Sequence, residues 1–196
     1  MRMAIRLGSI FGIAIFIHFT WVLIFALVTF SMVAHFGEQF PHLSPAVQIG
    51  IGVIASVLFF GSVLFHELAH SWLAQRYGYE VRSITLFVFG GVAEIKDEAK
   101  EPEAEIWIAL IGPASSYFLA LVFGTIWYAT QMSLAVVSSV AGWLALINVG
   151  LATFNLLPGL PLDGGRVLRG IAWKLSGNRE HATRIASGAG RFLSYL

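Results

Sequence analysis

The chain of 196 residues lacks cysteine and has few charged residues, and each shortage excludes a class of protein. Without cysteine there is neither a disulfide framework nor a thiolate metal site. Charged residues make up only 12% of the sequence, about half the fraction of a typical soluble domain, whereas 57% of the residues are hydrophobic. The formal net charge of +1 gives no indication of nucleic-acid binding. We therefore expect an integral membrane protein whose first partner is the lipid bilayer.

Four apolar segments are long enough to cross a bilayer, which takes roughly 20 helical residues. They cover about residues 18–36, 46–74, 106–130 and 134–157, and a partial fifth begins at about 182. The predicted fold class is an all-α polytopic membrane protein, a transmembrane helix bundle forming a single domain over residues 1–196. The sequence is still apolar at Leu196, so we expect the C-terminal part of a longer protein to follow.

The twelve Lys and Arg residues are distributed unevenly around these spans. They precede the first span, lie between the second and third, and follow the fourth, while the loops 37–45 and 131–133 contain none. By the positive-inside rule, this alternation predicts a cytoplasmic N-terminus. The second and fourth spans then both run toward the cytoplasm, so their C-terminal ends reach a similar depth.

The second span contains the sequence His66-Glu67-Leu68-Ala69-His70. On a helix, His66 and His70 lie one turn apart on the same face and can share one zinc ion. Glu67 then lies close enough to accept a proton from a water molecule at that ion. Ionisable side chains are costly inside a membrane span and usually mark a functional site. The predicted site lies in the cytoplasmic half of the bilayer.

Asn155 lies on the last turn of the fourth span, and the chain continues through Pro158, Gly159 and Pro161 to Asp163. These prolines and this glycine cannot continue a regular helix, so we expect an irregular stretch. Asp163 is the only acidic residue between positions 105 and 180. A catalytic zinc with two His ligands needs a third protein ligand, often a carboxylate, and Asp163 reaches the matching depth. We predict that Asp163 is that ligand.

Two polar residues beside this stretch have more than one interpretation. The amide of Asn155 can stabilise an oxyanion or hold a substrate carbonyl, or it can bond to carbonyls of its own helix end. Arg166 can pair with Asp163 or face the cytosol.

Together, these motifs resemble those of the site-2 protease family of intramembrane zinc metalloproteases. The resemblance includes Ile17-His18-Phe19-Thr20, His66-Glu67-Leu68-Ala69-His70, Phe89-Gly90-Gly91-Val92-Ala93, Ile111-Gly112-Pro113-Ala114-Ser115, and Asn155 with Pro158, Pro161 and Leu162-Asp163-Gly164-Gly165-Arg166. Their order spans essentially the whole chain. Within the family, the chain is most similar to a prokaryotic subgroup with a compact six-span core and a cytoplasmic tail of cystathionine-β-synthase (CBS)-type domains.

The resemblance implies a zinc metalloendopeptidase of a prokaryotic plasma membrane. His66, His70 and Asp163 would bind one Zn²⁺ per chain, Glu67 would be the general base, and Asn155 would contact the substrate or the oxyanion. Substrates would be single-span membrane proteins, cleaved in or near their transmembrane segments. The tail would bind a regulatory nucleotide, and a homo-oligomer is compatible with this arrangement.

Short membrane-associated strands complete the prediction. Residues 83–95 are rich in β-forming residues and predict a strand, a bend at Gly90-Gly91 and a second strand. Its edge would pair with an extended substrate, or the hairpin would merely fill the cavity. Residues 3–17 form either a second strand pair, as the resemblance implies, or an extension of the first helix.

Two other functions use the same residues. A membrane metal transporter would need further polar residues along the spans, and the first, third and fourth spans offer few. An inactive metal-binding scaffold would keep the ligands but not the proteolysis.

Overall fold

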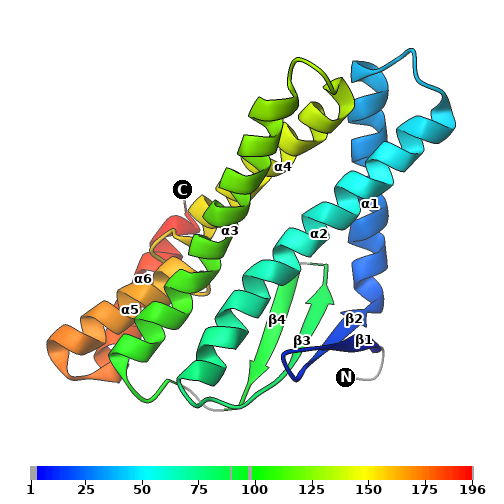
Figure 1. Cartoon of the computed structure of the whole chain (residues 1–196). Coiled ribbons are helices and arrows are strands. Elements are labelled where there is room, and N and C mark those ends of the chain that lie inside the picture. Colours follow the sequence, from blue (N-terminus) through cyan, green and yellow to red (C-terminus); the bar gives the residue numbers. More distant parts are fainter. Residues whose placement is uncertain (1–3, 89, 97–98, 196) are drawn as a thin grey trace.

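The computed structural model of the chain describes residues 4–88, 90–96 and 99–195. Four long helices stand above a small sheet and a pair of shorter helices (Figure 1). Phe89, one of the residues that carry the family resemblance, lies outside the described part, as does the basic residue Arg2.

The four long helices are each long and apolar enough to cross a membrane. They are α1 (Phe19–Gln39), α2 (Pro45–Arg76), α3 (Pro102–Thr130) and α4 (Ala135–Asn155). The four predicted spans are thus confirmed, with ends shifted by a few residues. Proline opens both α2 and α3, where its missing N–H costs no hydrogen bond. His18 caps α1 by accepting a hydrogen bond from the backbone N–H of Thr20.

The strands are β1 (Ala4–Ile10), β2 (Ile13–His18), β3 (Val81–Phe87) and β4 (Gly90–Ile95). They form one sheet in the order β1-β2-β3-β4, in which β2 and β3 are parallel and the other pairs antiparallel. Both predicted strand pairs are therefore present. The bend expected at Gly90-Gly91 is wrong: Gly91 pairs with Leu86, and Gly90, at a φ of +124°, already pairs with Phe87. Glycine tolerates this φ at the first position of the strand.

Residues 158–162 are irregular, as predicted, but a helix that the sequence analysis missed begins directly afterwards. This helix is α5 (Asp163–Ser176), so Asp163 lies in its first turn rather than in the irregular stretch. α5 escaped prediction because it is amphipathic rather than apolar. α6 (Arg179–Leu193) begins three residues before the expected fifth span and is capped by Asn178. It is not among the candidate spans of the described chain, so a fifth span there stays a prediction.

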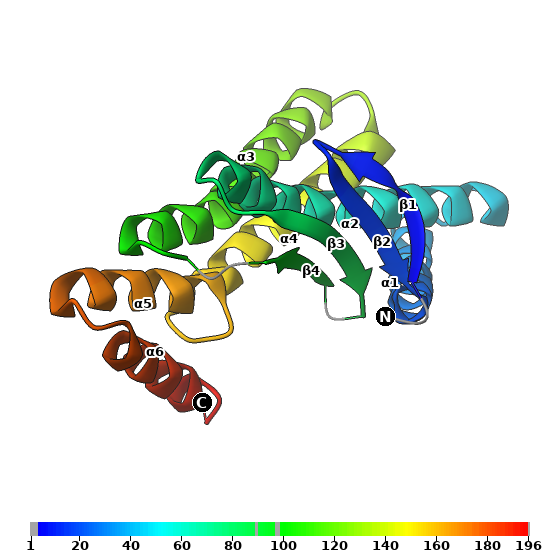
Figure 2. The same cartoon turned by 90° about the horizontal axis from the view of Figure 1, so that it is seen from below.

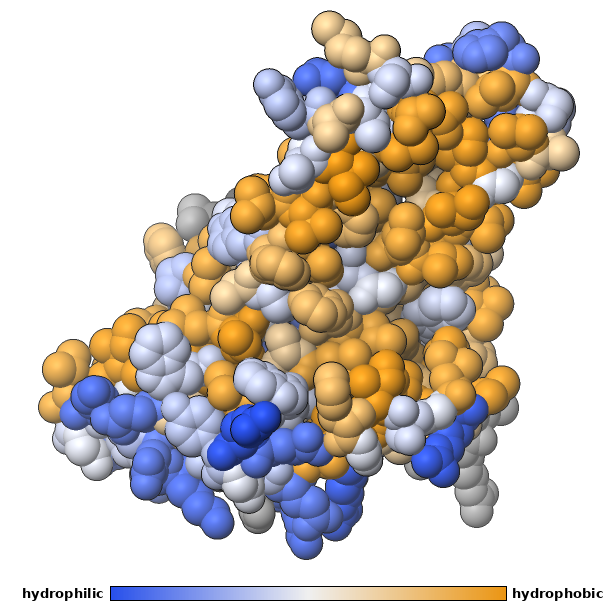
Figure 3. Space-filling view, viewed as in Figure 1, coloured by the Kyte–Doolittle hydropathy of each residue, from blue (hydrophilic) through white to orange (hydrophobic). Residues whose placement is uncertain are grey.

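The two ends of the helix bundle differ in character. The α1–α2 and α3–α4 connections lie at one end, and the sheet, α5 and α6 lie at the other (Figure 1). Hydrophilic residues gather at these two ends and leave an apolar surface between them (Figure 3). The view from below shows the sheet beside the α5–α6 pair, both at the end of α2 that carries the His pair (Figure 2).

Two apolar clusters hold this arrangement together. One includes Ile13, Ala74, Ile84 and Ile108 and joins the sheet to α2 and α3. The other surrounds Phe36, which is fully buried between α1 and α2. The first cluster lies beside the candidate site and fixes the position of the sheet against it.

Candidate metal centre

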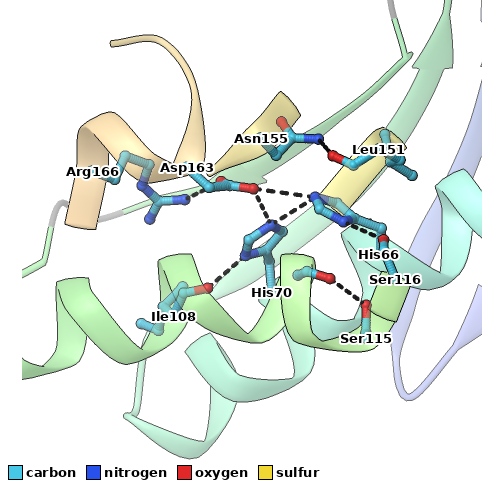
Figure 4. Close-up of polar contacts among 10 residues, drawn as sticks. His66, His70, Ile108, Ser115, Ser116, Leu151, Asn155, Asp163 and Arg166 are labelled. Carbon is cyan, nitrogen blue, oxygen red and sulfur yellow. Dashed lines mark hydrogen bonds and ion pairs between the residues drawn. The ribbon is translucent and has the colours of Figure 1, made fainter. Parts of the chain in front are cut away.

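Three ligand atoms converge between α2 and α5. The Nε2 atoms of His66 and His70 lie 3.1 Å apart, and Oδ2 of Asp163 lies 3.2 Å from the first and 3.1 Å from the second. All three side chains are buried and point toward one another (Figure 4). The helix α2 supplies both imidazoles from one face, and the first turn of α5 brings in the carboxylate from 93 residues further along the chain. The structure thus brings together the three predicted ligands.

The helix α3 contacts both imidazoles at Nδ1, the ring nitrogen that faces away from Asp163. Nδ1 of His70 lies 2.5 Å from the carbonyl oxygen of Ile108, and Nδ1 of His66 lies 3.0 Å from Oγ of Ser116. A carbonyl oxygen can only accept, so Nδ1 of His70 carries the proton, and Nε2 of the neutral ring presents a lone pair. Metal-binding histidines are typically oriented in this way by a partner on their other nitrogen.

This geometry fits a metal ion. The Nε2 lone pair of His70, Nε2 of His66 and a carboxylate oxygen of Asp163 face one another, and a shared cation satisfies all three. Ligands at zinc distances of about 2.0–2.1 Å in a tetrahedral site lie roughly 3.3 Å apart, close to the separations of 3.1 and 3.2 Å seen here. Two imidazoles and one carboxylate also form a donor set that zinc accepts in catalytic sites.

The three ligands open onto a cavity of about 630 Å³ that contains Glu67. Gly91 of β4 lies directly against this glutamate, since a Cβ atom at position 91 would overlap Glu67 Cγ. The carboxylate therefore lies between the ligand group and the edge strand of the sheet. It is placed to exchange a proton with a molecule bound in the cavity.

Asn155 and Arg166 line the same cavity. Nδ2 of Asn155 donates to the carbonyl of Leu151 at 2.9 Å, which is the helix-end hydrogen bond that the sequence analysis weighed against a substrate contact. Because Asn155 also lines the cavity, a contact with substrate is compatible with its position. Nη1 of Arg166 lies 3.9 Å from Oδ1 of Asp163, so the pairing with Asp163 is the interpretation that the structure supports.

The sequence analysis missed the groups that orient the histidines. Ser116 was detectable in principle, because it is a polar residue in an apolar span. Ile108 was not, since it contributes only its backbone carbonyl, which any residue could supply. The close approach of the Gly112 backbone to the His70 ring was missed as well.

Comparison with known proteins also identifies a family of metalloproteases for most of the chain. Residues 54–135 and 126–196 match the family described as Peptidase family M50. The chain is 43% identical over its whole length to "Putative zinc metalloprotease sll0528" of Synechocystis sp., and 41% identical to "Putative zinc metalloprotease Rip3" of Mycobacterium tuberculosis. It covers 51% and 50% of these proteins, so the chain spans about half the length of the curated relatives that it matches.

A solved structure shares the fold. The site-2 protease from Methanocaldococcus jannaschii superposes with a TM-score of 0.66 at 30% sequence identity, covering 98% of this chain and 82% of that one. The family match includes both halves of the ligand group, the His pair of α2 and the carboxylate of α5. The chain therefore belongs to Peptidase family M50, the site-2 protease family of membrane zinc metalloproteases.

Proposed function

We propose that the protein containing this chain hydrolyses peptide bonds in or near transmembrane segments of single-span membrane proteins. His66, His70 and Asp163 would hold one zinc ion per chain, and Glu67 would be the general base. The observation that carries this proposal is the convergence of three buried ligand atoms beside a glutamate in one cavity. An inactive scaffold needs the ligands but has no use for the glutamate.

The chain's own residues supply the proton transfers. Zinc in such a site supplies Lewis acidity and makes water nucleophilic near neutral pH. Glu67 accepts the proton of the attacking water and passes it to the leaving amine as the peptide bond breaks. The Asn155 amide, once it exchanges its bond to Leu151, donates to the oxygen of the scissile carbonyl.

The edge strand β4 is the part of the cavity suited to hold a peptide. It pairs with β3 on one side, and it is the last strand in the sheet order, so its other edge has no strand partner among the described residues and could pair with an added strand. Gly91 and Val92 of this strand line the cavity together with Glu67. A substrate helix would have to unwind, because its peptide bonds are otherwise hidden inside its own hydrogen bonds.

The chain is a multi-pass membrane protein, and its orientation is part of the proposal. The basic residues outside the spans support a cytoplasmic N-terminus in a prokaryotic plasma membrane, with the site in the cytoplasmic half of the bilayer. The relatives extend well beyond the matched region, which leaves room for a regulatory, nucleotide-binding tail in the whole protein.

The test is cleavage of a reconstituted single-span substrate together with metal analysis of the same samples. We expect Glu67→Gln to keep its zinc and to lose activity by a factor of about 100 or more. Asp163→Ala should lose both zinc and activity. Glu80→Gln is the matched control, since Glu80 is exposed outside the cavity and pairs with Lys96. Undiminished turnover in Glu67→Gln, or full zinc content in Asp163→Ala, would refute the assigned roles.

Metal transport is the competing function. A transport path needs several ligand groups across the membrane, whereas His66, His70 and Asp163 form the only group of three or more such side chains among the described residues. Zinc flux into proteoliposomes containing the chain, without substrate cleavage, would favour the transporter.

A further inference from the structure

An apolar groove lies on the outside of the helix bundle, away from the metal centre. It has a volume of about 400 Å³ and lies between α2, α3 and the tip of the β1–β2 hairpin. Its lining residues are Phe11, Phe65, Leu68, Ala69, Trp72, Ile111, Ala114, Ser115 and Phe118. On α2 these residues recur at the spacing of one helix face, about 100° or more away from the face of His66 and His70. A ligand in the groove would therefore not touch the metal ligands His66 and His70.

Beside the indole N–H of Trp72, the lining leaves a ligand nothing polar to bind. The one side-chain hydroxyl, that of Ser115, donates to the carbonyl of Gly112 in its own helix at 2.7 Å. The carbonyl of Phe11 at the hairpin tip accepts from Gln75. Because these polar groups already have partners, the groove favours a hydrocarbon chain over a peptide or a sugar.

A positive charge stands at one end of the groove. The guanidinium carbon of Arg76 lies 5.3 Å from the centre of the Trp72 ring, on the same face of α2. Arg76 is exposed, and no carboxylate of the described residues lies within ion-pair distance of it. Arginine beside tryptophan at the end of a membrane span is the usual setting for contact with lipid headgroups.

The distance along α2 from the far end of the groove to Arg76 matches the thickness of one leaflet of a bilayer. Phe65 and Arg76 are eleven residues apart on α2, which corresponds to about 16 Å at 1.5 Å per residue. Half of a hydrocarbon core of about 30 Å is about 15 Å. A phosphate at Arg76 would therefore place an acyl chain along the whole groove, from Trp72 to Phe65.

We infer that this groove binds one acyl chain of an anionic phospholipid, with the phosphate held by Arg76. A transmembrane helix is too large to be the occupant, because a helix about 10 Å wide needs several times this volume over the same length. The aromatic side chains Phe11, Phe65 and Phe118, each more than 40% exposed, would be covered by the bound chain.

Fluorescence quenching by brominated lipids tests the site in the detergent-purified chain. Trp72 is the only tryptophan of the groove among six in the sequence, so the difference between wild type and Trp72→Phe isolates its signal. Brominated phosphatidylglycerol should quench that signal at an about fivefold lower concentration than brominated phosphatidylcholine. Arg76→Gln should remove the difference between the two lipids.

A pair of alanines on α3 provides the matched comparison. Ala114→Leu fills the groove and should abolish the Trp72-dependent quenching, while Ala129→Leu, exposed on the same helix outside the groove, should leave it unchanged. Equal quenching by the two lipids in the wild type, or unchanged quenching in Ala114→Leu, would overturn the inference. Absence of quenching by either lipid would show that a protein segment or nothing occupies the groove, with the same consequence.

Discussion

The backbone of Gly112 in α3 lies directly against the imidazole of His70, where a Cβ atom would overlap Nε2. Nε2 is the atom that faces His66 and Asp163, and the opposite nitrogen of the same ring is bonded to the carbonyl of Ile108. The imidazole ring is therefore held between the Gly112 backbone and the Ile108 carbonyl, both in α3. A single methyl group at position 112 is enough to move the ligand atom.

Gly112→Ala should accordingly lose zinc, with an affinity reduced by about 100-fold, because it displaces a ligand. The measurement is zinc content after equilibration with a competing chelator. Gly124→Ala is the matched control on the same helix, since a Cβ atom there meets only Ala145 at an ordinary 4.0 Å. Equal zinc retention in the two variants would show that His70 does not need its present position.

Ser116→Ala should weaken zinc binding less, by about tenfold, because the His66 ring loses the partner of Nδ1 but keeps its space. The neighbouring variant Ser115→Ala removes a hydroxyl that bonds only to the Gly112 carbonyl. Zinc titration should therefore separate the two serines. Identical affinities would mean that Ser116 does not orient the ligand.

The four long helices and the principal site residues could be predicted from sequence for a simple physical reason. A bilayer requires long apolar segments, and polar side chains inside them, such as His66 and His70, stand out against that background. Asp163 could be added because charge alternation gave the depth at which the fourth span ends. That argument needed no knowledge of how α5 folds.

What escaped prediction has no such signature. α5 is amphipathic and follows a Pro- and Gly-rich stretch, so neither length nor apolarity marks it as a helix. Its start at Asp163 depends on close backbone packing, since Cβ atoms at Gly164 or Gly165 would overlap the backbone of residues 156–160. The contact between Gly91 and Glu67 likewise joins residues from two elements whose relative position a single sequence does not give.

Gly91→Ala tests that contact. An added methyl group would push the Glu67 side chain away from the cavity, and a displacement of about 1 Å can cost about 100-fold in rate. We expect kcat to fall while zinc content is unchanged, because no metal ligand is touched. Gly50→Ala on α2, where a Cβ atom meets nothing within 4 Å and which does not line the cavity, should cleave at nearly the wild-type rate. Loss of zinc in Gly91→Ala would instead indicate a disturbed fold.

An ion pair between a buried carboxylate and a partly exposed arginine links α3 and α5 beside the site. Glu105 of α3 is fully buried and accepts hydrogen bonds from Nε and Nη2 of Arg169 in α5, with only its Oε1 atom engaged. Oε2 has no partner among the described residues. Removing the carboxylate leaves the guanidinium of Arg169 without its partner, and because that group is partly exposed the cost is below the about 3–5 kcal/mol of a fully buried charge.

Glu105→Leu should therefore lower the melting temperature in detergent and also weaken zinc binding, because Arg169 lies six residues after Asp163 on the same helix. The matched control is Glu103→Leu, which removes an exposed pair with Lys174 between the same two helices. Solvent screens that pair, so its loss should leave the melting temperature unchanged. If the double variant Glu105→Leu/Arg169→Leu regains the stability lost in Glu105→Leu, the uncompensated charge is the cause. If it remains equally unstable, the loss comes from packing between α3 and α5.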